Sequence, residues 1–301
     1  MKTRPSFVSL RLVAAASCIV AFAAGCATTN RVALTPAHKT ELTATQPLAV
    51  VPQQEIGVDI NRSNMTGVMG GGLVWAITDA VIDHSRTKKA EGNVTVARDA
   101  LIDFDFGRTL VAALDQELAG VGWLHAGKCT IQHVADGAAA RKLAQNLGAS
   151  ALLIVDTDYR FTSDFGAIAL TLQVTIYEKG AKSDAEPIYK NTFYTLWGFP
   201  ASATTAGGGA VGGAVELWAQ NHGKAAREAI TQGCTELAAM VAYDLPLSEA
   251  ANRAAKDGQK RGTLMVQNRL LNVPPLAGTV EKQPGNRVWL RLPSGELVAS
   301  Y

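Results

Sequence analysis

Residues 151–178, ALLIVDTDYRFTSDFGAIALTLQVTIYE, decide the fold of this chain. The segment begins with five consecutive apolar residues, a pattern typical of a strand buried on both faces. Residues 168–178 then alternate, with apolar side chains at every second position, which predicts a strand with one face on a core. Residues 187–198, PIYKNTFYTLWG, predict a third strand immediately afterwards. Strands that follow one another this closely pair in antiparallel fashion.

Helix patterns surround these strands. Apolar residues repeat at helical spacing over 110–121 and again over 140–147, where Asp136 is a good N-cap. Strands are expected within 46–60 and 123–134, and a long helix is expected to end near Asp244. A short helix over 249–256 and three strands with turns at 284–286 and 293–295 follow. We predict an α+β fold with a mixed, largely antiparallel sheet, helices on one face and a small C-terminal β meander.

The segments GRTLVAALDQELAGVGWLHAGKC (107–129) and ARKLAQNLGASALLIVDTDYRFT (140–162) run as helix, strand, helix and buried strand. This order resembles the α/β domain of several envelope proteins: the curli-secretion lipoprotein, the lipoprotein activator of penicillin-binding proteins, and the amino-terminal domain of the Tol translocation protein. The resemblance implies a fold and an envelope setting. It carries over no functional residue.

The first residues predict an export signal. An uncharged, apolar run from Leu12 to Ala24 follows a positively charged start at Lys2, Arg4 and Arg11. The run has about 13 residues, whereas a membrane-spanning helix needs about 20. Ala23-Ala24-Gly25-Cys26 resembles the lipobox of bacterial lipoproteins, which implies that Cys26 is acylated and becomes the first residue of the mature protein. An ordinary cleaved signal with an incidental cysteine is the alternative.

The expected layout has four parts. Residues 1–25 are a lipoprotein signal peptide, and 26–45 are the lipidated cysteine with a flexible tether. Residues 46–245 form an α/β periplasmic domain, and 246–301 hold the short helix and the β meander. Ala27 follows the lipidated cysteine, where aspartate would suggest inner-membrane retention, so we expect the periplasmic face of the outer membrane. An anchor of two or three acyl chains binds stably, unlike a single chain.

Charge excludes a nucleic-acid partner. Loss of the signal lowers the number of lysines and arginines from 28 to 25, against 26 aspartates and glutamates, so the mature chain has a net charge of −1. No basic field remains to attract a polyanion. The partners expected are the membrane, through lipid on Cys26, and an envelope protein or a peptidoglycan-associated component. A homo-oligomer stays open as an alternative.

Two glycine-rich segments lead into helices. Their glycines could provide close internal packing or a contact surface for a partner, and packing is the favoured interpretation. A membrane helix over the first segment is disfavoured because Asp79 and Asp83 interrupt it. The glycines concerned are Gly67, Gly70, Gly71, Gly72, Gly207, Gly208, Gly209, Gly212 and Gly213.

The mature chain keeps two further cysteines. Cys129 lies in a predicted strand, and Cys234 lies on the apolar face of the long helix that would cover the sheet. An oxidising compartment permits a disulfide between them, and the alternative is two separate buried thiols.

No catalytic, cofactor-binding or metal-binding motif is present. Asp79, Asp83 and His84 could suggest metal ligands, but a solvated helix edge explains them better. The aspartates within 156–164 could suggest a calcium loop, but Phe161 stands where that loop needs glycine. His84 and His222 lie on apolar stripes, which favours buried structural histidines.

The sequence therefore predicts a non-enzymatic, membrane-anchored scaffold or adaptor. The alternative is a subunit of an oligomeric envelope assembly or secretion complex. A hydrolase is a third, weaker alternative.

Overall fold

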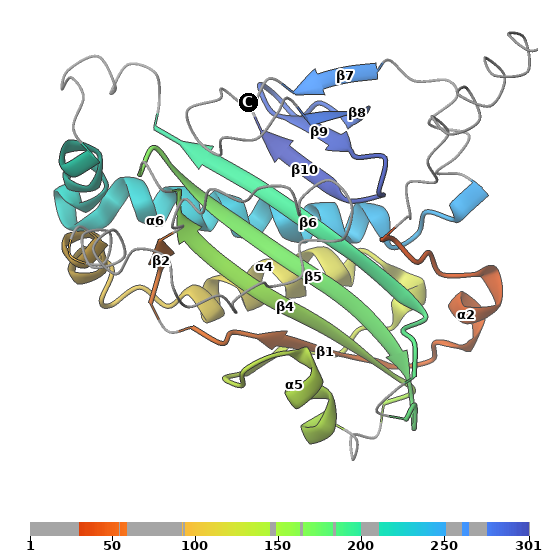
Figure 1. Ribbon diagram of the computed structural model, residues 1–301. Coiled ribbons are helices and arrows are strands. Elements are labelled where there is room, and N and C mark those ends of the chain that lie inside the picture. The colour runs from red at the N-terminus through yellow and green to blue at the C-terminus, as the bar shows by residue number, and fades with distance from the viewer. Residues whose placement is uncertain are drawn as a thin grey trace, which may run out of the picture.

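The computed structural model describes residues 30–53, 55–58, 92, 94–144, 149–162, 165–182, 185–199, 211–250, 261–264 and 276–300. These residues form one mixed, ten-stranded sheet with helices packed on it. The prediction of an α+β fold with a mixed, largely antiparallel sheet is confirmed (Figure 1).

The centre of the sheet is the antiparallel group predicted from the alternating segments. It consists of β4 (Ala151–Phe161), β5 (Ala167–Glu178) and β6 (Tyr189–Gly198). In this register Val155 lies opposite Val174, and Leu172 lies opposite Phe193. Every second side chain of β5 from Ile168 to Ile176 is buried, as the alternation requires. Figure 1 shows the three long strands running side by side across the molecule.

Parallel strands extend this centre on one side. β1 (Thr45–Val50) pairs in parallel with β4, and β3 (Thr130–Gln132) pairs in parallel with β1 at the sheet edge. The short β2 (Gly57–Val58) also pairs in parallel with β4, at its far end. Between β1 and β3 the chain makes the covering helix α4, which is the crossover that parallel strands need.

The C-terminal strands continue the same sheet. β7 (Arg261–Leu264), β8 (Leu276–Lys282), β9 (Val288–Arg291) and β10 (Leu297–Ser300) pair antiparallel in sequence order. β10 also pairs in parallel with β6, so the meander belongs to the main body. It has four strands where the sequence pattern predicted three, because the turn signals marked only the two later hairpins.

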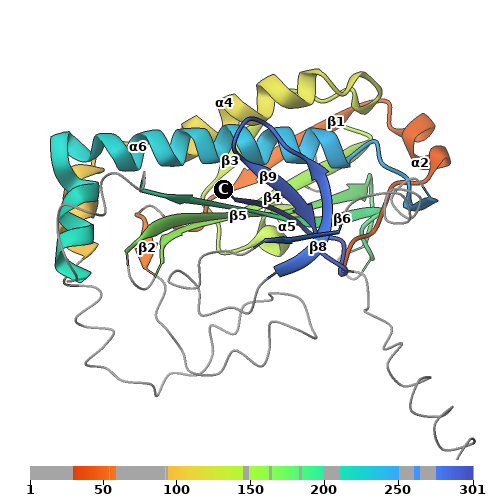
Figure 2. The same cartoon turned by 90° about the horizontal axis from the view of Figure 1, so that it is seen from above.

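Two helices cover one face of the sheet. α4 (Phe106–Ala119) begins at Asp105, whose side chain accepts a hydrogen bond from the Arg108 N–H at 2.8 Å, and it buries the leucines expected from its spacing. α6 (Val211–Asp244) lies beside α4 and packs on β5 and β6. Figure 2 shows both helices side by side on the same side of the sheet. The main hydrophobic core fills the space between them and the strands.

A short helix lies on the opposite face, which the prediction of helices on one face missed. α5 (Gly137–Ala144) begins at Asp136, whose side chain accepts from the Ala139 N–H at 2.8 Å, as expected of an N-cap. Its Ala140 packs on Val50 and Ile154 in a small second cluster. That cluster is why the first residues of β4 are apolar at consecutive positions, since both faces of the strand are covered there.

The N-terminal segment belongs to the folded body. Val32 forms an antiparallel bridge with Lys190 of β6, and the six-residue helix α2 (Pro36–Glu41) follows. Leu34 and Leu42 are buried in the main core. The prediction of a flexible tether is therefore wrong for residues 30–45. Threonine- and alanine-rich composition suggested a tether, but composition carries no information about these long-range pairings.

Helix α6 is sharply kinked. Gln220 leaves the helical conformation, and the next three residues have positive φ: Asn221, His222 and Gly223. Figure 2 shows the first part of α6 turning away from the long remainder. His222 is exposed at this corner, so its predicted place on a buried apolar stripe is wrong. Among the described residues, no helix is both long and apolar enough to cross a membrane.

Candidate functional site

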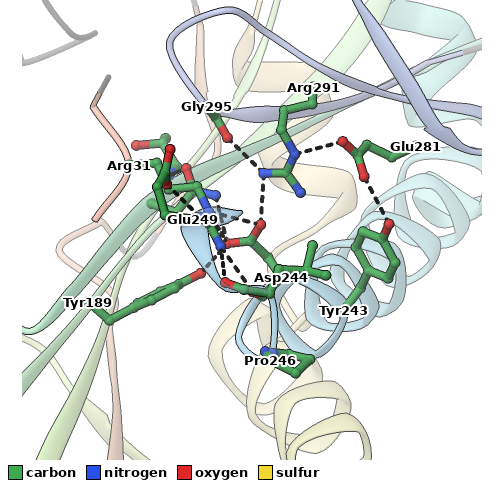
Figure 3. A network of polar contacts seen from close by, with 12 residues as sticks. Arg31, Tyr189, Tyr243, Asp244, Pro246, Glu249, Glu281, Arg291 and Gly295 are labelled. Atoms are coloured by element: carbon green, nitrogen blue, oxygen red, sulfur yellow. Dashed lines mark hydrogen bonds and ion pairs between the residues drawn. The ribbon is translucent and has the colours of Figure 1, made fainter. Parts of the chain in front are cut away.

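A buried ionic cluster lies where α6 ends. The Asp244 carboxylate is fully buried and forms ion pairs with Arg31 Nε at 3.0 Å and Arg291 Nη1 at 2.7 Å. The Tyr189 hydroxyl donates to the same carboxylate at 2.7 Å, and Asn191 Nδ2 donates at 3.0 Å. Figure 3 shows the side chains of Arg31, Tyr189 and Arg291 converging on Asp244. We call the group Arg31, Tyr189, Asp244, Glu281 and Arg291 the clasp.

Arg31 brings the N-terminal segment into the clasp. Besides its ion pair with Asp244, its Nη2 donates to the Leu247 carbonyl at 2.8 Å, and its Nη1 lies 3.4 Å from Glu249. Only 1% of its side chain is exposed. A guanidinium removed from water needs such a complete set of acceptors, because an unpaired buried charge costs several kcal/mol. The residue is thus a structural part of the body.

Arg291 joins the C-terminal strands to the same group. Its Nε donates to Glu281 at 2.8 Å, and its Nη1 donates to the Gly295 carbonyl at 2.9 Å. Burial alone would lower the pKa of Arg291, but the carboxylates of Asp244 and Glu281 outweigh burial and raise that pKa above its usual value. Glu281 also accepts from the Tyr243 hydroxyl at 2.9 Å. Burial and this hydrogen bond raise the pKa of Tyr243 to about 12. Two arginines and two carboxylates therefore balance inside the core.

A second buried ion pair joins the C-terminal strands to α6 at Glu236, about two helical turns before Asp244. The Arg287 guanidinium pairs with Glu236 of α6, and its Nη1 donates to the Leu196 carbonyl at 2.9 Å. Trp289 Nε1 donates to Glu236 at 3.1 Å. Two arginine–carboxylate pairs thus dock the β8–β10 strands onto α6. Because such pairs tolerate little misplacement, they fix the register of that docking.

A polar cavity of about 310 Å³ lies on the opposite face of the sheet, beside α5. Asp156 of β4, Gln173 and Thr175 of β5, and Lys190 of β6 contribute to its lining. Burial raises the pKa of Asp156 to about 6, although its carboxylate accepts from the Gly137 N–H at 2.8 Å. Arg141 closes one side, with its guanidinium 3.8 Å from the centre of the Tyr177 ring. The cavity can accept a small polar group.

The predicted contact glycines are mostly outside the described residues. Cys26, the predicted lipidation site, also lies outside them, as do Gly67, Gly70, Gly71, Gly72, Gly207, Gly208 and Gly209. Gly212 and Gly213 lie in the first turn of α6. A methyl group added at Gly213 would meet no atom within 4 Å, so close packing does not explain that glycine.

The predicted disulfide is wrong, because both cysteines are free buried thiols. Both do lie on the helix-covered side of the sheet, as expected. Cys129, however, lies just before the edge strand β3, and its backbone N–H donates to Asp115 of α4. Cys234 lies in α6 next to Gly233, which faces Leu170 of β5. Strands β1 and β4 separate β3 from β5, and each step across a sheet is about 4.8 Å. A disulfide needs Cα atoms within about 7 Å.

The remaining candidates for chemistry have structural surroundings. Asp156 and Asp158 lie within β4, which confirms a strand in place of a calcium loop, and Asp158 pairs with Arg160 Nε at 2.6 Å. Burial raises the pKa of the Cys129 thiol to about 12, so this thiol is protonated and a poor nucleophile. Within the described ranges, no three histidine, cysteine or acidic side chains gather as a metal site would require. Asp79, Asp83, His84 and Asp164 lie outside those ranges.

Sequence patterns missed every residue of the clasp. Arg31 lies in a segment with weak periodicity, and its partner Asp244 is 213 positions away. A charged residue within the apolar end of a long helix was the one available hint, since aspartate there must find partners or water. No spacing rule connects such a residue to an arginine in another part of the chain.

No family model matches this chain, and no curated protein matches it either. A solved structure, a dodecamer of a PelC variant from Paraburkholderia phytofirmans, is similar at 13% sequence identity, over 72% of this chain and 95% of that chain, with a TM-score of 0.27. A TM-score at this level supports no conclusion about fold or function.

Proposed function

We propose that this protein is a lipid-anchored envelope protein that acts by binding and positioning another envelope component, at the periplasmic face of the outer membrane. The observation that carries the proposal is the place of Arg31, five residues after Cys26. Its guanidinium is buried against Asp244 in the body of the domain. An acyl anchor on Cys26 would therefore hold the folded body directly, as a positioning role requires.

The surroundings of the reactive groups favour binding over catalysis. The buried charges of the clasp neutralise one another, and each is committed to a structural partner. Cys129 and Cys234 have raised thiol pKa values because of burial, so neither is an activated nucleophile. A near-neutral mature chain would recognise its partner by surface shape and apolar contacts instead of by a strong field. The partner proposed is an envelope protein or a peptidoglycan-associated component.

Metabolic labelling with an alkyne fatty acid tests the anchor. The wild-type chain should label and fractionate with membranes, and the Cys26→Ala variant should do neither. Equal labelling and fractionation of the two forms would contradict the proposal. The Cys129→Ala variant is the matched control, because its thiol is buried and should not change labelling.

Crosslinking in intact cell envelopes tests the binding role. Affinity capture of the wild-type protein should recover a partner in a defined ratio, and recovery should fall when Cys26→Ala releases the body from the membrane. Hydrolysis of an envelope polymer by the purified, fully folded protein would contradict a non-enzymatic role.

A further inference from the structure

We propose that one end of the body, formed by Asn30, Val32 and the β9–β10 turn at 292–295, faces the lipid surface at close range and keeps the domain in one orientation. This inference rests on the proposed lipid anchor at Cys26. It adds which surface meets the lipid, and it replaces a loosely tethered domain by one held on a very short connection.

The length of the connection follows from the sequence. Three residues, 27–29, separate Cys26 from Asn30. Four Cα-to-Cα steps span at most about 14 Å when fully extended. An acylated cysteine lies at the membrane surface, so Asn30 must lie within about this distance of it. A flexible tether of about 20 residues would instead allow a typical reach of about 25 Å and free tumbling of the domain.

Asn30 is attached firmly to the β9–β10 turn. Its backbone N–H donates to the Ser294 carbonyl at 2.8 Å, and its side-chain amide donates to Glu296 at 3.2 Å. The next contacts follow without a gap: Arg31 enters the clasp, and Val32 exchanges two backbone hydrogen bonds with Lys190, at 2.8 and 3.0 Å. The attachment at Asn30 therefore limits how far the body can lie from an anchor at Cys26.

The chemistry of this end suits a lipid surface. Three carboxylates at this end are buried: Glu296 is bonded to Asn30, and Asp244 and Glu281 are neutralised by arginines. Glu249, which is 39% exposed, is paired with Arg31. Val32 is 41% exposed, and Pro293 is exposed at the tip of the turn. Acidic groups that are paired with arginines repel anionic phospholipid little. The small exposed apolar surface of Val32 and Pro293 is compatible with the headgroup region of the membrane.

The other end of the body is then held away from the lipid. From Gly223 to Asp244, α6 advances about 30 Å at 1.5 Å per residue. The turn that carries Ile102 lies at the Gly223 end, where Gly223 approaches the Ala100 carbonyl. Figure 1 shows α2 at one end of the body and the kinked part of α6 at the other. Ile102, 86% exposed, is therefore a reporter for the end that faces away.

Lipid-dependent fluorescence quenching tests the orientation. Pro293→Cys and Ile102→Cys each place one exposed thiol at an end, and the buried Cys129 and Cys234 thiols stay unreactive toward the label. Each acylated variant is labelled with bimane and reconstituted into phosphatidylcholine–phosphatidylglycerol vesicles that contain headgroup spin-labelled lipid. The label at 293 should lose most of its fluorescence, and the label at 102 should keep it.

Two further measurements separate the outcomes. Insertion of about 20 Gly/Ser residues between Thr29 and Asn30 should keep flotation with vesicles and remove the difference between the two labels. Vesicle flotation of the unlabelled chain, with Cys26→Ala as control, tests the anchor by itself. If flotation depends on Cys26 while both labels are quenched equally, or the label at 102 more strongly, the orientation is wrong although the proposed anchor stands. If flotation does not depend on Cys26, the anchor and the orientation are both wrong.

Discussion

The two ends of the long part of α6 are stabilised in different ways. At Asp244 the helix ends inside a cluster of paired charges that joins the N-terminal segment, β6 and the C-terminal strands. The other end begins directly after Gly223, the last of three consecutive residues with positive φ. Arg227 stabilises this corner by donating to the backbone carbonyls of His222 and Ala100, both at 2.8 Å. One end depends on buried charges that neutralise one another. The other depends on backbone geometry, and the ion pair there, between Arg227 and Asp103, is exposed on the Asp103 side. The two ends should therefore respond to different substitutions, with different magnitudes.

The largest effect is expected at the charged end. Asp244→Ala leaves the buried guanidinium groups of Arg31 and Arg291 without their shared carboxylate. Removal of one partner from a buried ion pair destabilises a protein by about 3 to 5 kcal/mol. The free energy of unfolding, measured by urea denaturation, should fall by that amount. Glu249→Ala is the matched control, since this acid contacts Arg31 with 39% of its side chain exposed and should change stability by less than about 1 kcal/mol. Equal effects of the two substitutions would contradict the role assigned to the clasp.

A smaller effect is expected at the kink. Gly223→Ala forces a side chain into a left-handed conformation with φ of 71° and places its methyl group 2.9 Å from the Ala100 carbonyl oxygen. Strain and crowding together should destabilise the fold by about 2 to 3 kcal/mol in thermal or urea unfolding. Gly213→Ala, also in α6, meets open space and should be neutral or stabilising by up to about 1 kcal/mol. A destabilising Gly213→Ala together with a neutral Gly223→Ala would reverse this assignment.

Asp156 shows what burial does to a carboxylate without an arginine. Within the described residues its one polar contact is the Gly137 N–H, and burial raises its pKa to about 6. Because the folded pKa is raised, the stability that this group contributes is present at low pH and is lost as pH rises through about 6.

Asp156→Asn should therefore stabilise the protein at pH 7, by roughly 1 to 2 kcal/mol after allowance for solvent screening. The gain should shrink as pH falls toward 4, where the wild-type carboxyl is protonated. Urea unfolding of both forms across pH 4 to 8 measures the difference. A constant difference over this range would show that titration of Asp156 is not its cause.

The smallest effect is expected at the exposed tip of the kink end. Ile102→Ser changes a side chain that is 86% exposed, so the free energy of unfolding should move by no more than about 0.5 kcal/mol. Leu110→Ser in α4 is the contrast, because Leu110 is fully buried and its replacement should cost several kcal/mol. A large loss from Ile102→Ser would mean that Ile102 is buried in the folded protein, and it would remove Ile102 as a reporter of the lipid-distant end.

Sequence patterns predicted the centre of the fold because the signals there are local. The alternation in β5, the apolar start of β4 and the cap at Asp136 each act within a few residues. The order of strands, the parallel pairing of β10 with β6 and the location of α5 depend on contacts between distant segments. Periodicity does not encode those contacts.

The clasp was unpredictable for the same reason, and the kink for a different one. Arg31 and Asp244 carry no motif, and their pairing depends on the packing of the N-terminal segment along β6. At 220–223 the apolar spacing continues smoothly through the break, so a helical pattern hid three left-handed residues. The glycine at 223 was a weak hint, since glycine is the residue best suited to positive φ.

Amide hydrogen exchange of the mature chain tests most directly the claim that the N-terminal segment is part of the folded body. The amides of Asn30 and Val32 donate to the carbonyls of Ser294 and Lys190. In the wild-type protein they should exchange slowly, with protection that approaches that of the β5 amides, and in Arg31→Met their protection should drop while β5 stays protected. Exchange of Asn30 and Val32 at the rate of an unfolded peptide in the wild-type protein would restore the flexible tether and contradict the account.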